Sequence, residues 1–330
     1  MKSRASVKWF FLGMFFFAFI LAGNGESLGQ SDFPAKPIEV IVPYTPGGGV
    51  DLGVRFFSDK WAEFLGQPVV IVNKPGAGGY LGGKAVALAK PDGYTLLGTS
   101  ESNLMLTPLL RKEPDYTIDS FRILFFFSKT YMYFSVRSDS PWKTLADLLA
   151  EAKKNPGKLT YSTFGVGSAP HFAMEMLLKV GGAKMTLVPF KSSPESMTAL
   201  IGRNVDLCVV FGVPGVSGTG LVRQLAVGDY ERAPDFPNVP TLKELGYDLG
   251  YNTSIYLGLS APVKIPEKAL TKLIDAHDKV RQKYAKEIGE KLPKLDQHPT
   301  YIDGIAGMKI HKDKEKIFKE LIPQIGIKIE

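Results

Sequence analysis

The sequence contains very little cysteine and histidine. Its 330 residues include one cysteine, Cys208, and four histidines. A single cysteine excludes an internal disulfide, so the fold must rest on a hydrophobic core, for which 45% hydrophobic residues suffice. No His-Glu-x-x-His motif or other paired histidine spacing indicates zinc, and we expect no metal site. Cys208 stands in an apolar run without charged neighbours, which predicts core packing and not a reactive thiolate.

Catalytic and cofactor-binding motifs are also missing. The Gly-x-Ser-x-Gly elbow of α/β hydrolases does not occur, and the glycines at 47–49 are not followed by the Gly-Lys-Ser/Thr of a Walker A loop. The pair Gly76 and Gly78 lacks the third glycine of a dinucleotide fingerprint, because Leu81 stands in its place. These absences predict a protein that is not an enzyme and needs no cofactor. An exported enzyme on the same fold is the minor alternative.

Charge and the first residues bear on partners and location. The formal net charge of +7 does not indicate a nucleic-acid partner, since basic residues at 2, 4 and 8 belong to a segment that we expect to be removed. They precede an apolar run from Trp9 to Ala22, a pattern typical of a secretory signal peptide. We expect the signal peptide to cover about residues 1–29 and the rest to be periplasmic. An uncleaved membrane anchor is the alternative.

The chain is organised around residues 38–51, IEVIVPYTPGGGVD. The apolar run at 38–42 predicts a buried parallel strand, three glycines follow it, and a helical pattern begins at Asp51 and ends at Gly66. A strand, a glycine loop and a helix N-terminus favour an anion, because free N–H groups and the helix dipole both point there. The alternative is a tight turn in which Asp51 is only a helix cap.

The same plan recurs downstream. We expect strands at 69–72, 94–98 and 159–162, followed by loops at 73–79, 99–103 and 163–168. Ligands of open parallel α/β sheets bind at the carboxyl ends of the strands, so loops 44–51, 76–80 and 99–103 should share one edge. In the second half, Ser168 is either a ligand contact or a helix cap. We expect His171 to be solvated or to cap the helix, with a position in the cleft as the alternative. Lys191 is either a ligand cation or a surface lysine.

A change of domain is expected between two neighbouring strands. Residues 122–127 and 131–136 read as strands with little room for a helix between them, and a strand at 255–260 could return the chain. We therefore predict an α/β fold of two lobes with a ligand cleft between them. Lobe 1 comprises residues 30–132 and 256–330, and lobe 2 comprises residues 133–255.

Five blocks of sequence carry a resemblance: PAKPIEVIVPYTPGGGVD, GQPVVIVNKPGAGGYLGGKAVALAKPDGYTLL, YSTFGVGSAPHFAMEML, VPFKSSPESMTALIGRNVDL and ERAPDFPNVPTLKELGY. They resemble the Bug family, the extracytoplasmic receptors of tripartite tricarboxylate transporters. The resemblance implies a type II periplasmic binding protein, a small organic acid (carboxylate) as ligand, and membrane permease subunits as partners. We expect a monomer. The alternative is the same binding protein presenting its ligand to a membrane sensor kinase.

The resemblance also implies which residues face the ligand. One wall would comprise Tyr44, Gly48, Gly49, Ala77, Gly78, Thr99 and Ser100. The other would comprise Ser162, Thr163, Gly167, Ser168 and Lys191. The chain departs from the family pattern at Ser192, Ala199, Gly212 and Tyr256. Because of Gly212 and Tyr256, the resemblance does not determine the shape of the pocket. Glu101 is unusual beside an anion site, and we expect it either to face away or to pair with a ligand amine.

Overall fold

The computed structural model describes residues 32–212, 216 and 219–327. The expected signal peptide, residues 1–29, lies outside the described residues. Within them, no helix combines the length and the apolar character that a membrane crossing requires.

The first sheet has six strands in the order β11-β4-β10-β3-β1-β2. Strand β1 pairs in parallel with β2 and β3, whereas β10 is antiparallel to β3 and β4, and β11 is antiparallel to β4. The strands are β1 (Ile38–Val42), β2 (Val69–Asn73), β3 (Thr95–Thr99), β4 (Phe121–Thr130), β10 (Ile255–Pro262) and β11 (His298–Asp303).

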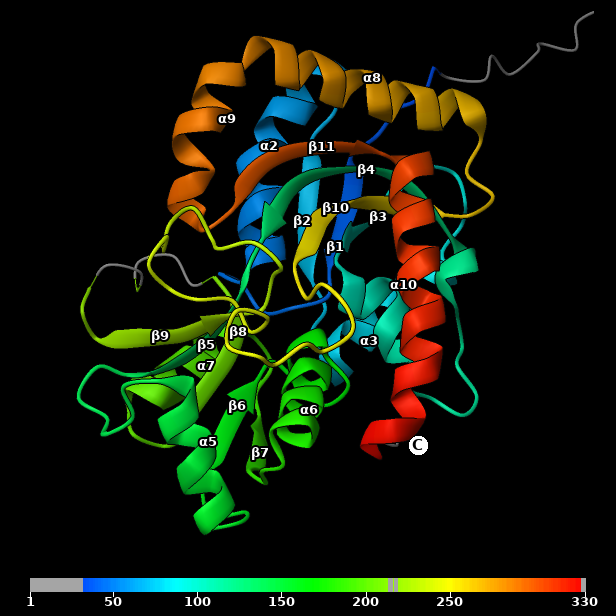
Figure 1. Cartoon of the computed structure of the whole chain (residues 1–330). Helices are drawn as coiled ribbons and strands as arrows, with labels where there is room; N and C mark the ends of the chain where they lie inside the picture. The colour runs from blue at the N-terminus through cyan, green and yellow to red at the C-terminus, as the bar shows by residue number, and fades with distance from the viewer. Residues whose placement is uncertain (1–31, 213–215, 217–218, 328–330) are drawn as a thin grey trace, which may run out of the picture.

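The second sheet has five strands in the order β7-β6-β8-β5-β9. Strand β6 is parallel to β7 and β8, and β5 is antiparallel to β8 and β9. The strands are β5 (Met132–Arg137), β6 (Thr160–Thr163), β7 (Thr186–Pro189), β8 (Leu207–Phe211) and β9 (Val222–Val227). The two sheets lie in separate halves of the molecule, each with its own helices (Figure 1).

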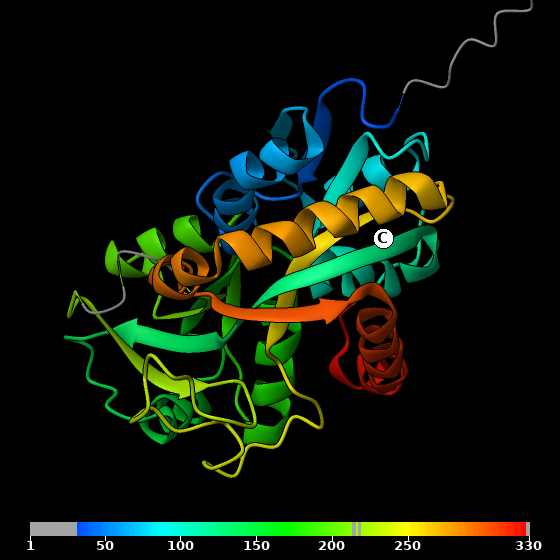
Figure 2. The same cartoon turned by 90° about the horizontal axis from the view of Figure 1, so that it is seen from above.

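Helices cover both sheets. Around the first lie α2 (Gly49–Leu65), α3 (Tyr80–Ala87), α4 (Thr107–Leu109), α8 (Glu267–Lys283), α9 (Ala285–Lys291) and α10 (Gly304–Ile325). Around the second lie α5 (Leu145–Lys154), α6 (Ala169–Gly181) and α7 (Ser193–Ile201). Short segments are the 3-10 turns η1 (Ala77–Gly79), η3 (Ile118–Ser120) and η4 (Pro293–Leu295) and the π-helical η2 (Ser102–Leu106). Viewed from above, α8 runs across the first sheet (Figure 2).

The predicted first helix is confirmed in α2. Its apolar stripe is buried at Val54, Phe57 and Trp61, and Gly66 ends it in the left-handed conformation with φ 69°. The indole N–H of Trp61 donates to Nδ1 of His277 on α8 at 3.1 Å. Burying each large side chain of this stripe contributes roughly 1.5–3 kcal/mol, so α2 is fixed between the sheet and α8.

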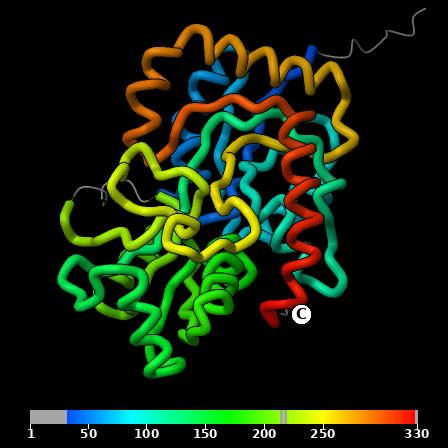
Figure 3. The backbone as a smooth tube through the Cα atoms, viewed as in Figure 1, coloured from blue at the N-terminus to red at the C-terminus, as the bar shows by residue number. Residues whose placement is uncertain are grey.

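The chain passes between the sheets twice, and the two crossings lie together. β4 ends at Thr130 and β5 begins at Met132, as expected of two strands with no helix between them; the return crossing precedes β10 (Figure 3). The buried carboxylate of Asp229 joins both crossings, since it accepts from Lys129 at 2.7 Å and from Asn252 at 2.7 Å. Lys129 precedes the first crossing, and Asn252 precedes the second.

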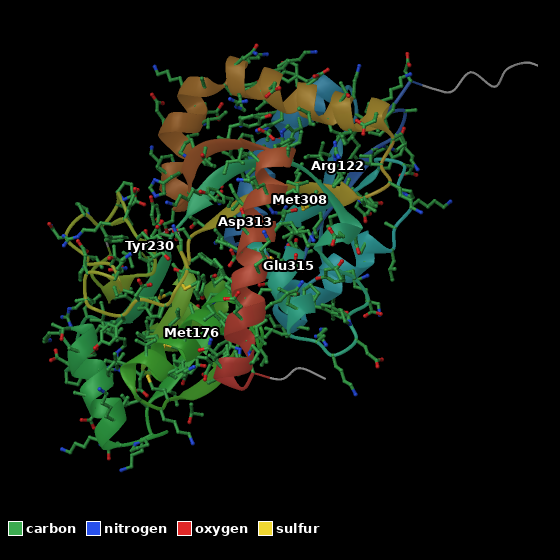
Figure 4. The ribbon with its side chains drawn as sticks, turned by 45° about the vertical axis from the view of Figure 1, so that its right-hand side comes forward. Arg122, Met176, Tyr230, Met308, Asp313 and Glu315 are labelled. Carbon is green, nitrogen blue, oxygen red and sulfur yellow. The ribbon has the colours of Figure 1, made fainter. Side chains whose placement is uncertain are left out.

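Helix α10 links the two halves. Near its start, the His311 ring stacks on Phe126 of the first sheet, with 5.1 Å between ring centroids. Farther along, Phe318 packs against Phe172 of α6, at 4.9 Å. Figure 4 shows α10 in front, with Met308, Asp313 and Glu315 along its length. The helix therefore contacts the first sheet and also α6, beside the second.

The C-terminal region completes the first half of the molecule. Tyr284 adopts a non-helical conformation that separates α8 from α9. Strand β11 was not predicted, since it pairs irregularly with β4 and shows no clear alternation. Helix α10 begins at Gly304, where Asp303 caps it by accepting from the N–H groups of Ile305 and Ala306.

Candidate functional site

The glycine loop after β1 is held by the buried carboxylate of Asp51. One carboxylate oxygen accepts from the Gly47 N–H and from Nε of Arg55, each at 2.9 Å. The other accepts from the side-chain amide of Asn73, at the end of β2, at 2.8 Å. Gly48 is the N-cap of α2 and contributes no side-chain cap, so the first turn keeps its N–H groups for other partners. The loop shape is therefore set by a charged group beneath it.

Burial and hydrogen bonding act in opposite directions on Asp51. Burial raises the pKa of this carboxyl, but the hydrogen bonds from Arg55, the Gly47 N–H and Asn73 outweigh it, and the pKa lies below the ordinary value of 3.8. Asp51 is therefore ionised at neutral pH, and its charge is satisfied by partners within the loop and helix.

The three loops expected to share one edge of the first sheet do meet. The hydroxyls of Tyr44 and Ser100 lie 2.8 Å apart. The Ser100 N–H donates to the side-chain oxygen of Asn103 at 3.0 Å, and that side chain donates back to the Gly98 carbonyl. A Cβ added at Gly79 would lie 2.8 Å from the Tyr44 hydroxyl, so only glycine fits there. The prediction that loops 44–51, 76–80 and 99–103 share one edge of the sheet is confirmed.

The facing loop of the second sheet is held by neutral groups. The Ser168 hydroxyl donates to the Gly165 carbonyl at 2.7 Å, and the Gly167 N–H donates to Nδ1 of His171 at 3.0 Å. The Ser162 hydroxyl lies 3.3 Å from the Ser196 carbonyl. These hydroxyls are therefore engaged within their own lobe.

The two sets of loops touch each other. A Cβ added at Gly78 would lie 3.0 Å from the Val166 carbonyl oxygen, and the Ala169 N–H donates to the Ser102 hydroxyl at 2.9 Å. The rings of Tyr44 and Phe164 meet edge to face with centroids 5.4 Å apart. The ends of β1 and β3 thus face the loop after β6 directly.

A small cavity lies between the sheets where these loops meet. Its volume is about 30 Å³, room for about two water molecules. Residues of both halves line it: Tyr44, Gly48, Gly49, Val50, Ser100, Thr130, Phe164, Ser192, Ser193, Phe211, Ile255 and Leu257. The N-terminal ends of two helices, α2 and α7, border it, and none of these residues carries a charged side chain.

The predicted site residues fall into two groups. Tyr44, Gly48, Gly49 and Ser100 line the cavity. The other predicted residues do not line it. Ala77 and Gly78 lie in the turn that contacts residues 165–168, and Thr99 is hydrogen-bonded to Ser260. Ser162, Thr163, Gly167 and Ser168 lie in the facing strand and loop, and Lys191 is exposed.

Several cavity residues had no signal in the sequence. Phe164 lies within the predicted loop 163–168, and Ser192 directly follows the predicted Lys191, but neither was among the residues expected to face the ligand. Thr130, Phe211 and Ile255 lie at strand ends near the crossings, and only the antiparallel pairing of β10 with β4 and of β5 with β8 brings them together. Sequence periodicity does not report that pairing.

Glu101 points away from the cavity and does not contribute to its lining. Its buried carboxylate pairs with Lys314 of α10, and Lys314 also donates to the Ser254 carbonyl at 3.0 Å. Burial raises the pKa of Glu101, and Lys314 opposes that effect only in part. Of the two expectations for Glu101, the structure favours the one in which it faces away.

The structure also locates Tyr256 and Gly212, the two departures from the family pattern that bear on the shape of the pocket. Tyr256 lies on β10 between the cavity residues Ile255 and Leu257, with its ring 5.9 Å from that of Phe126, and so points to the other face. Gly212 is tightly enclosed, because a Cβ there would lie 2.2 Å from that of Asp296.

Among the residues that the structure describes, no group of three or more His, Cys, Asp and Glu side chains could hold a metal ion. Cys208 is fully buried on β8, and burial raises the pKa of its thiol to about 12, so it packs as a small apolar residue.

Comparison with known proteins identifies the family of this chain. The model of the tripartite tricarboxylate transporter family receptor matches residues 54–327. The UPF0065 protein in the gbd 5′ region of Cupriavidus necator is 34% identical over 304 residues, covering 90% of each chain. Protein BugT of Bordetella pertussis is 32% identical over 234 residues, 68% of this chain and 71% of BugT.

Solved structures show the same fold. The periplasmic binding protein BugD superposes with a TM-score of 0.82 at 28% identity, covering 90% of this chain and all of BugD. An R. palustris protein solved with adipate gives a TM-score of 0.81 at 25% identity, covering 90% of this chain and 99% of that one. The family match covers most of the chain and the fold match covers both sheets, so this chain belongs to the tripartite tricarboxylate transporter receptor family.

Proposed function

We propose that this protein is a periplasmic receptor that captures a small organic acid between its two lobes and delivers it to a tripartite tricarboxylate-type membrane transporter, without catalysing a reaction. The observation that carries the proposal is the cavity bordered by the N-terminal ends of α2 and α7, one from each side. N–H groups and dipoles of both helices favour a negative charge between them. Family membership supports the transporter as the partner in this proposal.

Neutral groups can supply the affinity that such a receptor needs. A hydrogen bond to a charged group contributes about 1.5–3 kcal/mol, and micromolar binding requires about 8 kcal/mol. Roughly four to six bonds from first-turn N–H groups and from hydroxyls such as those of Tyr44 and Ser100 meet that requirement after ordering costs. No cationic side chain in the cavity is needed.

We propose that the cavity residues of the first sheet, Tyr44, Gly48, Gly49 and Ser100, contact the ligand directly. Ala77, Gly78 and Thr99 then shape their wall, and Ser162, Thr163, Gly167, Ser168 and Lys191 shape or border the other. The lobes correspond to residues 30–132 with 256–330 and to residues 133–255.

Ligand entry requires the lobes to separate. A cavity of about 30 Å³ is smaller than any organic acid of several carbons. The crossings joined by Asp229 are the natural hinge, because within the described residues the backbone passes between the sheets only there. Closure around the acid would then create the surface that the transporter reads.

A binding experiment tests the proposal. Protein without residues 1–29, stripped of ligand by unfolding and refolding, would be titrated with mono-, di- and tricarboxylates, amino acids and uncharged sugars. Saturable binding of carboxylates, with a rise in melting temperature, is expected. Binding of sugars, or of no carboxylate at all, would contradict it. Turnover of a bound acid would contradict the non-catalytic part alone.

A further inference from the structure

The cavity lining provides one place for a negative charge. The glycine loop and the start of α7 are neighbours, since a Cβ on Gly47 would lie 3.8 Å from Cγ of Pro194. The N-terminal turn of α2, the N-terminal turn of α7 and the paired hydroxyls of Tyr44 and Ser100 therefore serve a single region. Two helix N-termini that converge in this way favour one carboxylate.

The rest of the lining is apolar. Phe164 and Phe211 lie with ring centroids 6.0 Å apart, and Ile255 and Leu257 come from the same face of β10. All four side chains are buried. The apolar wall also reaches the glycine loop, because a Cβ on Gly49 would lie 3.6 Å from Cδ1 of Leu257. An apolar ligand body is stabilised there by loss of water-exposed surface.

Among the residues that the structure describes, none that lines this cavity offers a cation to a second carboxylate. The residues that line it carry no charge, and neighbouring basic side chains are engaged or outside. Lys129 pairs with the buried Asp229 at 2.7 Å, and Arg55 pairs with Asp51 at 2.9 Å. Lys191 has an exposed side chain and is not among the lining residues. A second carboxylate enclosed there would lose its hydration without a partner.

An α-amino group on the ligand would also lack a charged partner among the lining residues. An ammonium needs a carboxylate or several acceptors when it is enclosed, and no acidic side chain lines the cavity. Glu101 and Asp51, which directly follow the lining residues Ser100 and Val50, are engaged by Lys314 and Arg55. Acidic amino acids would therefore bury one unpaired cation and one unpaired anion.

Resting on the proposed function, we propose that the ligand of this receptor is a monocarboxylate with an apolar body, aliphatic or aromatic. Its carboxylate binds between the N-terminal ends of α2 and α7, and its body packs against Phe164, Phe211, Ile255 and Leu257. The chain discriminates against di- and tricarboxylates and against amino acids because it offers their additional charges no partner.

Ligand pairs with matched skeletons test this inference. Ligand-stripped protein would be titrated calorimetrically with hexanoate against adipate, benzoate against terephthalate, and butyrate against 4-aminobutyrate, with citrate as well. Each plain monocarboxylate is expected to bind at least about tenfold more tightly than its charged partner. Equal or tighter binding of adipate, terephthalate or citrate would overturn the inference and leave the proposed function intact. Binding of no acid in the panel would instead overturn the proposed function.

A charge-introducing variant gives a second, independent readout. Phe211→Lys places a cation in the apolar wall, and the ratio of hexanoate to adipate affinity is expected to fall by about tenfold or more. Tyr230→Lys, at a half-exposed position that does not line the cavity, is the matched control and should leave the ratio unchanged. An unchanged ratio in a folded Phe211→Lys variant would overturn the inference. The wild-type titrations decide the matter if that variant does not fold.

Discussion

The two walls of the cavity are built in different ways. The wall of the first sheet rests on the ionised and nearly inaccessible carboxylate of Asp51, which holds Gly47, Arg55 and Asn73. The wall of the second sheet rests on neutral bonds, among them the one from Gly167 to His171. Both present a helix N-terminus. Only the first depends on a buried charge, so the two walls should respond differently to mutation and to pH.

Removing the charge beneath the first wall should have the largest effect. Asp51→Ala leaves the Arg55 guanidinium, the Gly47 N–H and the Asn73 amide without their acceptor, and it frees the glycine loop. We expect a loss of about 2 kcal/mol or more in the free energy of unfolding, and loss of ligand binding. Urea unfolding and calorimetric titration measure the two effects.

The same helix provides a control for this substitution. Asp59 is exposed on α2, and Asp59→Ala should change the free energy of unfolding by no more than about 0.5 kcal/mol. If Asp51→Ala bound ligand as tightly as the wild type, the buried charge would not shape the first wall.

Acid should weaken the second wall before the first. Burial lowers the pKa of His171 from 6.5 to about 4. Because the folded pKa lies below the unfolded one, the stability from neutral His171 is complete above about pH 6.5 and is lost as the pH falls toward 4. The pKa of Asp51 is lowered from 3.8, so its contribution persists above that pH and is lost only below it.

Comparing wild type with His171→Gln isolates this effect, since the buried His277 and His311, whose pKa values burial also lowers, titrate in both proteins. Urea unfolding at pH 6.5 and 4.5 should show that the stability of the wild type falls more steeply, by about 1 kcal/mol per pH unit. Equal slopes in the two proteins would mean that His171 is not a neutral acceptor in the second wall.

Much of the first wall can be predicted from sequence, and less of the second. A buried strand, glycines and an amphipathic helix are local patterns, so β1, its loop and α2 were found with nearly correct ends. The apolar part of the cavity joins Phe211 to Ile255 across two sheets, and the Glu101–Lys314 pair joins residues far apart in the chain. Such contacts depend on strand order and helix docking, which a single sequence does not encode in any local period.

A methyl group added at Gly48, in the first wall, should weaken ligand binding while leaving the free energy of unfolding nearly unchanged. Gly48 has φ −75°, which any residue adopts, and a Cβ there meets nothing closer than 3.7 Å. In Gly48→Ala, the weaker N-cap and the stiffer unfolded chain roughly cancel, to within about 0.5 kcal/mol. The methyl would occupy the position proposed for the ligand carboxylate, so affinity should fall about tenfold. Titration and urea unfolding test this; undiminished affinity would place the carboxylate elsewhere.

Two helix N-caps with the same structural role test whether a single hydroxyl of the second wall contributes to ligand binding, the smallest effect expected here. The Ser192 hydroxyl caps α7 at the cavity by accepting from the Glu195 N–H, and Thr144 caps α5 in the same way from the Asp147 N–H, without lining the cavity. Replacing either with Ala should cost about 1 kcal/mol of unfolding free energy. Only Ser192→Ala should also weaken ligand binding, by a few-fold, because it removes a hydroxyl from the second wall. Equal affinity of the two variants would mean that α7 contributes only its backbone N–H groups to ligand binding, and not the Ser192 hydroxyl.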